Sequence, residues 1–286
     1  MADNYVHLNG CLVPADQAVV SVSDAGFLHG ASSFTTMRSH NGVVFRLGDH
    51  LARLLGTVEV LGLRTVATPE TLTAAVSELL AANELDDARL RITLTPGGFG
   101  GDPTVVITAE ALPEYPPAWY SDGIDVSITE LRQSPTDIAS GRKTGCYFPR
   151  ILAMRTAAAK KAQEALWFTP SGYLAEGCFC NVFIRSGDEL LTPPLDTPVL
   201  DGILRGVVME LCETLPIKCS DATPLLGREL LEAGEVFMTS SCSGIRPVVR
   251  VEDHVISDGK VGPITQELMQ AYQDLLETEC PPKTNK

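Results

Sequence analysis

The sequence predicts two α+β domains joined by a linker. Its 286 residues are more than one ordinary domain needs and suit two. Apolar residues recur with both helical and strand periods along the chain. Between the patterned parts, residues 112–123 (LPEYPPAWYSDG) are rich in proline and follow neither period, which is typical of a linker. The content of 44% hydrophobic and 20% charged residues is that of a folded globular protein.

The N-terminal part is predicted to mix strands and helices. Residues 34–47 (FTTMRSHNGVVFRL) are typical of a β-hairpin, because Asn41 and Gly42 readily adopt the positive φ angles of a tight turn. Residues 49–63 (DHLARLLGTVEVLGL) are predicted as a helix with one apolar face. That face comprises Leu51, Leu54, Leu55 and Val58; the further predicted elements are a helix over 69–85 and strands over 89–95 and 104–112, separated by the glycine-rich segment 96–103.

The C-terminal part begins with a predicted strand over 123–129 and continues with a helix from Phe148 onward. In this helix, Ile151, Leu152 and Met154 are expected to supply much of the apolar side. The remaining predicted elements are strands near 165–168, 181–185, 189–193 and 235–240, and helices near 203–214, 225–233 and 263–277.

Charge and composition exclude several classes of function. The net charge of −14, without any Lys/Arg-rich block, argues against a nucleic-acid ligand, because neutralising phosphates needs a basic surface. No apolar run is long enough to cross a bilayer and no signal peptide is recognised, so a cytoplasmic protein without a membrane partner is expected. The eight cysteines lack zinc-ligand spacing, which predicts mostly small core residues, no metal site and no disulfide framework.

Lys143 is the first candidate for chemistry. It lies in the segment 141–147 (GRKTGCY), directly before the predicted helix. A lysine amine is nucleophilic only after it has lost its proton, which burial or a neighbouring cation such as Arg142 promotes. From this segment alone, both a nucleophile and an ordinary solvated lysine remain open.

Glu176 is the second candidate. It follows a strand-like Gly-Tyr-Leu and precedes Gly177, with small and apolar residues around it. A single carboxylate in such surroundings indicates a buried anion with a partner, because burying an unpaired charge is costly. A glutamate in a turn is the alternative interpretation.

Three further features suit an anionic ligand. Gly202 opens a predicted helix, whose first N–H groups and positive dipole end favour a phosphate. The hydroxyl-rich turn 239–243 (TSSCS) follows a predicted strand and can bind oxyanions. Arg53 lies on the predicted helix three residues after His50. Each feature also has an ordinary structural interpretation.

Six blocks, taken together and in order, resemble the class IV aminotransferases, the pyridoxal-phosphate enzymes of fold type IV. They extend over most of the chain, from about residue 20 to residue 272. The resemblance implies an α+β, two-domain protein: a smaller N-terminal α/β domain (1–116), an interdomain linker region (117–140) and a larger C-terminal domain (141–286) that binds pyridoxal 5'-phosphate (PLP) between the two domains. The blocks are SDAGFLHGASSFTTMR, FRLGDHLARL, RKTGCY, GYLAEGCFCNVFI, LLTPPLDTPVLDGILRG and EVFMTSSCSGIRPV.

The resemblance also implies the roles of individual residues. Lys143 matches the lysine that holds PLP as a Schiff base and later moves a proton between the substrate Cα and the cofactor. Glu176 matches the glutamate that pairs with the protonated pyridine nitrogen, which keeps the ring able to accept electrons. Tyr147 matches a tyrosine that hydrogen-bonds the ring hydroxyl. Residues matching the phosphate site are Arg53, the backbone N–H groups of Ile203 and Leu204, and the hydroxyl of Ser241.

The substrate pocket combines features of several branches of the family. The Phe-Thr-Thr-x-Arg sequence from Phe34 to Arg38, and Leu204 in place of a threonine, resemble the 4-amino-4-deoxychorismate lyases. Tyr147 resembles the branched-chain and amine transaminases. The segment 95–103 lacks the arginines of the lyases and the arginine and histidine of the D-amino-acid enzymes.

These resemblances predict a PLP-dependent transaminase, similar to branched-chain aminotransferases, that moves an amino group between an amino acid or primary amine and a 2-keto acid. The alternatives are the lyase, which eliminates a group to give 4-aminobenzoate and pyruvate, a D-amino-acid transaminase, and a family member without catalysis.

The residues expected at the substrate include several cations. Arg91 matches an arginine of the branched-chain enzymes, and Arg89 and Arg38 add charge that suits a carboxylate-bearing substrate. The turn at Ser241 and Cys242 matches backbone that faces the substrate carboxylate. The family also implies a homodimer, in which His29 or Phe34 lines the pocket of the partner subunit.

Overall fold

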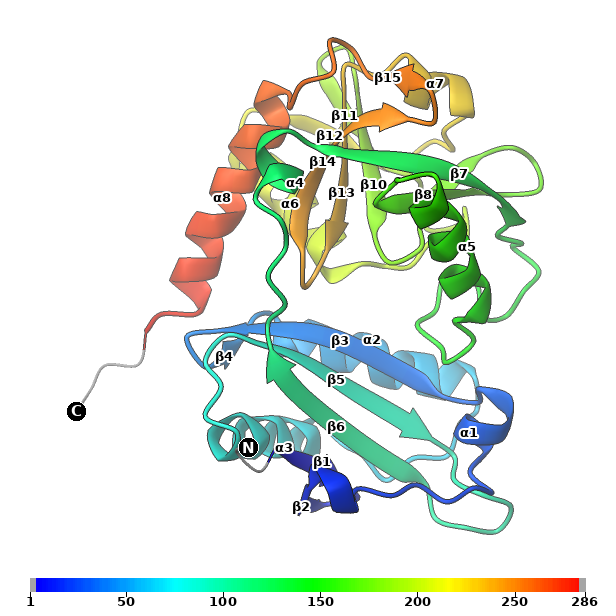
Figure 1. The fold of residues 1–286 in the computed structure, drawn as a ribbon, viewed down its shortest axis with the longest axis vertical. Helices are drawn as coiled ribbons and strands as arrows, with labels where there is room; N and C mark the ends of the chain where they lie inside the picture. Colours follow the sequence, from blue (N-terminus) through cyan, green and yellow to red (C-terminus); the bar gives the residue numbers. More distant parts are fainter. Residues whose placement is uncertain (1–3, 283–286) are drawn as a thin grey trace. The chain divides into compact units, whose positions relative to one another are not determined.

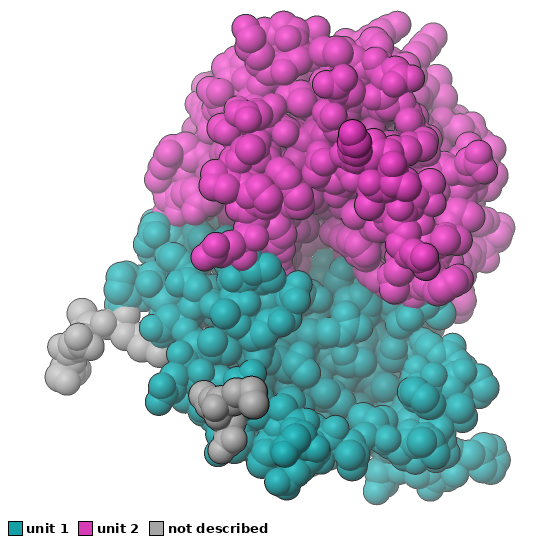
Figure 2. All heavy atoms as spheres, viewed as in Figure 1, with its two compact units in different colours: residues 1–113, 143–146, 275–286 teal, residues 114–142, 147–274 magenta. Residues whose placement is uncertain are grey.

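The computed structural model describes residues 4–282 and divides into two compact units (Figure 2). Unit 1 comprises the chain up to Pro113, the short segment Lys143–Cys146, and the chain from Leu275 onward. Unit 2 comprises Glu114–Arg142 and Tyr147–Asp274. Lys143 therefore belongs to unit 1, although the segments on both sides of it belong to unit 2. The division into domains at 1–116, 117–140 and 141–286 stays a prediction.

Unit 1 is built on a six-stranded sheet with the strand order β2-β1-β6-β5-β3-β4 (Figure 1). All its strand pairs are antiparallel. Its elements are β1 (Tyr5–Leu8), β2 (Cys11–Pro14), the short 3-10 helix η1 (Ala15–Gln17), α1 (Ala25–His29), β3 (Ser33–His40), β4 (Val43–Val44), α2 (Leu47–Val60), α3 (Pro69–Ala82), β5 (Ala88–Thr95) and β6 (Thr104–Ala111).

The predicted hairpin and helices of unit 1 are confirmed. Asn41 and Gly42 form the β3–β4 turn with φ angles of 52° and 75°. Helix α2 buries Leu51, Leu54 and Val58, as its apolar period predicts. Helix α3 begins after a threonine cap, with Pro at its start.

The two faces of the unit 1 sheet differ in chemistry. On one face, Met37, Leu90 and Ile92 are fully buried in the core that α2 and α3 complete. Because strand side chains alternate between faces, Phe34 and Arg91 lie on the opposite face. The sheet thus separates an apolar core from a face that carries Phe34 and several arginines.

Unit 2 is built on a nine-stranded mixed sheet with the order β12-β11-β10-β13-β14-β7-β8-β9, and β15 pairs with β14 (Figure 1). Strand β7 runs parallel to β14 and β8, and β11 runs parallel to β12. The strands are β7 (Ile124–Arg132), β8 (Glu164–Phe168), β9 (Leu174–Gly177), β10 (Asn181–Ser186), β11 (Glu189–Leu191), β12 (Lys218–Ser220), β13 (Glu235–Ser240), β14 (Gly244–Val251) and β15 (His254–Val255). The helices are α4 (Ala118–Ser121), α5 (Phe148–Ala159), α6 (Ile203–Thr214), α7 (Gly227–Leu231) and α8 (Pro263–Glu279), whose last residues from Leu275 count with unit 1.

The helix predicted from Phe148 forms, and its expected apolar side is right for Met154, which packs against the buried cluster of unit 2, but wrong for Ile151 and Leu152. The side chains of Ile151 and Leu152 are 50% and 43% exposed. The face of α5 that packs in unit 2 consists of the buried Ala153 and Ala157 with the partly buried Met154 beside them. Small side chains let a helix approach its neighbours closely, so the largest apolar residues need not mark the buried face.

The cysteines are only partly core residues. All eight are free thiols; Cys178, Cys180, Cys212 and Cys280 are buried, whereas Cys11 and Cys146 are exposed. Across residues 4–282, none of the helices combines the length and the apolar character that a membrane span requires.

Candidate active site

Lys143 is fixed to the start of strand β3 in unit 1. The Phe34 backbone N–H donates a 2.9 Å hydrogen bond to the Lys143 carbonyl, and Ser33 and Thr144 form a β-bridge. The Lys143 amine lies 4.9 Å from the centre of the Phe34 ring. A cation above an aromatic face is attracted by the ring quadrupole. The backbone of this segment is therefore held rigidly by a central strand of the sheet.

The sequence of the lysine segment suits this close approach. The Gly145 N–H donates a 3.0 Å hydrogen bond to the Ser32 carbonyl. A Cβ atom on Gly145 would collide with the Ser32 hydroxyl. Gly145 is thus required where the segment crosses the chain before β3.

Arg53 and His50 meet at a hydroxyl on β3. The Thr35 Oγ1 accepts a 3.3 Å hydrogen bond from Arg53 Nη2 and lies 2.8 Å from His50 Nδ1. Burial holds the pKa of His50 well below its usual value of 6.5, and the charges of Arg53 and Lys143 lower the pKa further. The Thr35 hydroxyl is thus hydrogen-bonded to both His50 Nδ1 and Arg53, so the threonine links the imidazole to the arginine.

The predicted substrate residues of unit 1 are partly brought together. The Arg91 guanidinium carbon lies 3.5 Å from the centre of the Phe34 ring. Arg38 is directly opposite Arg89 in the β3–β5 register, so both project from the same face as Arg91. Arg89 forms an ion pair with Glu110 at 2.5 Å. His29 ends helix α1 and is exposed.

Glu176 is a buried carboxylate at the end of strand β9 in unit 2. Its side chain is 4% exposed. Oε1 accepts hydrogen bonds from Arg150 Nη2 at 2.6 Å and from Gln133 Nε2 at 3.0 Å. Oε2 accepts a 2.9 Å hydrogen bond from the Leu200 backbone N–H. Glu176 is therefore a paired buried anion and not a turn residue.

The Arg150 side chain is the centre of this cluster. Nη1 donates to the carbonyls of Gly177 and Cys178, at 2.8 and 2.9 Å. Burial is the largest single influence and lowers the pKa of Arg150, but the interactions with Glu176, Tyr147 and Cys178 together outweigh it, so the pKa is raised. The guanidinium also lies 5.8 Å from the Tyr147 ring centre. Tyr147 stacks on Phe179 at 5.7 Å.

Helix α6 begins at Ile203 with an uncapped N-terminus. Gly202 at its cap makes no side-chain capping hydrogen bond, so the first N–H groups of the helix point outward without an intrahelical acceptor. A Cβ atom at Gly202 would collide with the Asn181 Oδ1, which explains the glycine. The Leu204 side chain is buried, so this residue offers a ligand only its backbone.

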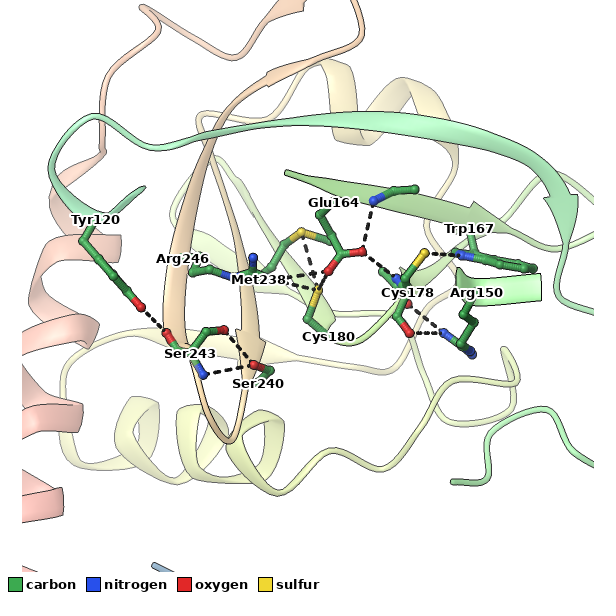
Figure 3. A network of polar contacts seen from close by, with 12 residues as sticks. Tyr120, Arg150, Glu164, Trp167, Cys178, Cys180, Met238, Ser240, Ser243 and Arg246 are labelled. Atoms are coloured by element: carbon green, nitrogen blue, oxygen red, sulfur yellow. Dashed lines mark hydrogen bonds and ion pairs between the residues drawn. The ribbon is translucent and has the colours of Figure 1, made fainter. Parts of the chain in front are cut away.

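The turn after strand β13 is ordered by its own hydroxyls. Ser240 and Ser243 are joined through their Oγ atoms at 2.7 Å, and the Ser243 N–H donates to Ser240 Oγ at 3.3 Å. Figure 3 shows these contacts, together with the Tyr120 hydroxyl that donates to the Ser243 carbonyl at 2.8 Å. Ser241 and Cys242, at the tip of this turn, are half-buried.

A second buried ion pair lies under the turn between β9 and β10. The Glu164 carboxylate pairs with Arg246 at 3.3 Å, and both side chains are almost fully buried. Figure 3 shows that Glu164 also accepts hydrogen bonds from the Cys178 N–H at 3.0 Å and the Cys180 thiol at 3.2 Å. Burial raises the pKa of the Cys178 thiol to about 12, and the charge of Glu164 adds to this effect. The thiol of Cys178 thus stays protonated.

Sequence reasoning did not single out Gln133, Arg150, Glu164 or Arg246. An arginine near the start of a helix and a glutamine after a strand carry no spacing signal, because their partners are distant in sequence. Across residues 4–282, no group of three or more His, Cys, Asp or Glu side chains could hold a metal ion.

The fold and these clusters define a class of protein, and comparison with known proteins identifies it. Residues 32–251 match the family model for amino-transferase class IV. The chain therefore belongs to the class IV aminotransferases, and it is an enzyme with the α+β architecture of fold type IV.

Individual relatives extend along the whole chain. A putative branched-chain-amino-acid aminotransferase of Methanocaldococcus jannaschii is 33% identical over 277 residues, which cover 94% of this chain and 96% of the relative. The D-alanine aminotransferase of Bacillus licheniformis is 28% identical and covers 96% of this chain and 98% of its own. The crystal structure of the Escherichia coli branched-chain amino acid aminotransferase superposes with a TM-score of 0.92 at 27% identity, covering 98% and 97% of the two chains. The enzyme thus resembles the branched-chain aminotransferases, as its sequence predicts.

Proposed function

We propose that the enzyme binds PLP through Lys143 and transfers an amino group between an amino acid and a 2-keto acid. The observation that carries this proposal is the buried Glu176 carboxylate, which is held by three donors. A buried, ionised carboxylate with remaining acceptor capacity suits a protonated ring nitrogen.

The chain offers a residue of suitable chemistry for each polar group of PLP. Glu176 would hold the ring nitrogen, and the Tyr147 hydroxyl would bind the ring hydroxyl. The phosphate would be bound by Arg53, by the Ser241 hydroxyl, and by the outward N–H groups of Ile203 and Leu204, because helix N-termini bind anions. The collision that a side chain at Gly202 would cause supports a closely fitted backbone at this point.

Each proposed site residue has a separate role in the reaction. When bound, PLP supplies a ring that stabilises negative charge on the substrate Cα. Lys143 first binds the cofactor and then, once the substrate has displaced it, carries the proton that leaves Cα. Glu176 keeps a negative charge beside the ring nitrogen. The neutral His50 orients Thr35 and, through it, the Arg53 side chain.

The substrate is expected to carry a carboxylate at the arginine face of unit 1. Arg38, Arg89 and Arg91 project from one face of the β3–β5 pair, and Phe34 lies beside Arg91. Cations on a low-dielectric face attract carboxylates. The Ser241–Cys242 backbone and His29 are proposed as additional substrate contacts. Branched-chain amino acids are the donors we expect, by similarity to a relative named for them, and the three arginines favour a keto acid that carries a second carboxylate.

An absorption experiment tests the proposal. The full-length protein, loaded with PLP, is mixed with single amino donors in the absence of an acceptor: L-leucine, L-glutamate, D-alanine and an R-configured aryl amine. One donor should bleach the yellow band of the lysine-bound cofactor, and a keto acid should restore it. A protein that binds no PLP, or one whose band no donor changes, contradicts transamination.

A second candidate is the 4-amino-4-deoxychorismate lyase reaction. The buried apolar side chain of Leu204, where transaminases carry a threonine, favours it. The same experiment separates the two functions. A lyase leaves the cofactor band unchanged with every amino donor but releases pyruvate from aminodeoxychorismate.

We further propose a cytoplasmic homodimer. The apolar side chains of Val22, Phe27, Leu28 and Phe99 are all more than half exposed on unit 1, and apolar groups of this kind favour a protein interface. The eight free cysteines fit a reducing compartment. Sedimentation equilibrium should give twice the monomer mass, and fractionation should locate the chain in the cytoplasm. A full-activity monomer contradicts the dimer, and recovery of the chain with secreted proteins contradicts the location.

A further inference from the structure

The Glu176 carboxylate has an asymmetric set of partners. Each oxygen of an ionised carboxylate offers about two lone-pair positions. Oε1 uses both, because it accepts from Arg150 at 2.6 Å and from Gln133 at 3.0 Å. Oε2 accepts from the Leu200 N–H at 2.9 Å, and within residues 4–282 no second donor reaches it. One acceptor position on Oε2 is therefore the one left for a ligand.

Arg150 determines which oxygen is left. Nη2 of the guanidinium also donates to Gln133 Oε1 at 3.2 Å, so the amide of Gln133 is turned with its NH2 group toward Glu176. The same NH2 group donates to the Pro198 carbonyl, which fixes it from the other side. Arg150, which only donates, and the Pro198 carbonyl, which only accepts, therefore fix the orientation of the amide together.

Arg150 also fixes the backbone that carries Glu176. Nη1 donates to the carbonyls of Gly177 and Cys178, the two residues that follow Glu176. The guanidinium lies 5.4 Å from the centre of the Trp167 ring, which is itself buried. Arg150 thus holds the carboxylate, its amide neighbour and the adjacent turn with one planar, rigid group. Figure 3 shows the arginine beside Cys178 and Trp167.

We propose that Arg150 is a positioning residue that directs Oε2 of Glu176 toward the ring nitrogen of the cofactor. This inference rests on the proposed function, because it requires that Glu176 binds PLP. Arg150 itself is not a catalytic residue, since Oε1 and the backbone carbonyls occupy its terminal nitrogens. Its effect should therefore be confined to the interaction that Glu176 makes.

The test compares two ligands that differ only at the ring nitrogen. The full-length apoenzyme is titrated with PLP and with 1-deazapyridoxal 5'-phosphate, in which a C–H group replaces that nitrogen. Tryptophan fluorescence reports binding. We define the ratio as the dissociation constant of the analogue divided by that of PLP. This ratio isolates the contact between Glu176 and the ring nitrogen, because all phosphate and lysine contacts are common to both ligands.

In the wild-type enzyme, PLP should bind more tightly than the analogue. Arg150→Met should reduce the ratio about tenfold, the effect of losing a hydrogen bond between charged groups. Arg150→Lys keeps a cation but lacks the planar fork, and it should give an intermediate ratio. Arg155→Met changes an exposed arginine on the same helix and should leave the ratio at the wild-type value.

The outcomes separate the two claims. A wild-type ratio above one that Arg150→Met leaves unchanged overturns the positioning role alone, even if both affinities fall together. A ratio that rises in Arg150→Met also overturns it, because the arginine would then oppose the ring charge and not position its partner. A wild-type ratio of one overturns both this inference and the proposed role of Glu176. If Arg150→Met does not fold, a folded Arg150→Lys with the wild-type ratio overturns the inference.

Discussion

Two clusters of charged residues differ in the partners that contact their charges. One is the lysine cluster of unit 1 (Lys143, Phe34, His50, Thr35 and Arg53), and the other is the glutamate cluster of unit 2 (Glu176, Arg150 and Gln133). In the lysine cluster, cations contact an aromatic ring and a hydroxyl at 4.9 and 3.3 Å. In the glutamate cluster, the arginine and the carboxylate form a 2.6 Å ion pair. The carboxylate of Glu176 is thus held in one orientation by a directly opposed charge, whereas the described contacts of Lys143 and Arg53 are to an aromatic ring and a hydroxyl.

This difference teaches what each cluster contributes. The lysine cluster contains the proposed nucleophile Lys143 and the proposed phosphate ligand Arg53, so its side chains should control cofactor binding and the chemical step. The glutamate cluster is linked to the Glu164–Arg246 pair through the backbone of Cys178, so its side chains are held in fixed positions. Changes there should affect stability and orientation as well as turnover.

Replacing the reactive lysine should have the largest effect. Lys143→Ala removes the only group proposed to bind the cofactor covalently, so kcat/KM should fall on the order of 1,000-fold or more. The yellow band should be absent after dialysis, while Lys160→Ala, an exposed lysine of unit 2, should keep both band and activity. Retention of the band in Lys143→Ala would place the nucleophile elsewhere.

Breaking the deeper ion pair of unit 2 should have the next largest effect. Arg246→Met leaves the Glu164 carboxylate buried and uncompensated, which should cost about 3 kcal/mol of unfolding free energy. Arg89→Met breaks a pair whose side chains are 40% and 59% exposed, and it should cost less than about 1 kcal/mol. Urea unfolding of both variants measures the contrast. Equal losses would show that burial does not distinguish the two pairs.

Changing the carboxylate itself tests its charge. Glu176→Gln keeps the size of the side chain but removes the negative charge next to the proposed ring nitrogen, so kcat should fall about 100-fold. The affinity for PLP should fall in parallel. Steady-state kinetics with saturating PLP, with Glu267→Gln as an exposed control, provides the measurement. A kcat within twofold of wild type would remove Glu176 from the reaction.

The smallest expected effect concerns pH and the lysine cluster. The folded chain keeps His50 neutral, because burial, Arg53 and Lys143 lower its pKa, whereas the unfolded chain protonates it below about pH 6.5. The unfolded state then binds more protons, so stability falls as pH drops below about 6.5, by at most about 1.4 kcal/mol per pH unit.

The variant His50→Gln cannot take up that proton. The stability difference between the wild type and this variant should shrink by about 2 kcal/mol from pH 7 to pH 5, as measured by urea unfolding. A difference that stays constant over this range would mean that His50 binds its proton equally well in the folded chain.

Much of the fold could be predicted because its signals are local. The Asn41-Gly42 turn, the apolar period of α2 and the glycine start of α6 each depend on residues adjacent in sequence. The family also followed from six ordered blocks, and the comparison with known class IV aminotransferases confirms it. The apolar side of α5 was predicted correctly for Met154 but wrongly for Ile151 and Leu152, because the buried face of this helix is formed by Ala153 and Ala157.

The sequence by itself determined the candidate Lys143, the candidate Glu176 and the class of enzyme, because motif residues occur at fixed spacing along the chain. Only the tertiary structure decided that Glu176 is paired with Arg150 and Gln133, which are 26 and 43 residues away. It alone also showed that Arg53 and His50 share the Thr35 hydroxyl. The physical reason is that a buried charge needs a partner within hydrogen-bond distance, and sequence does not specify which distant donor the folded chain supplies.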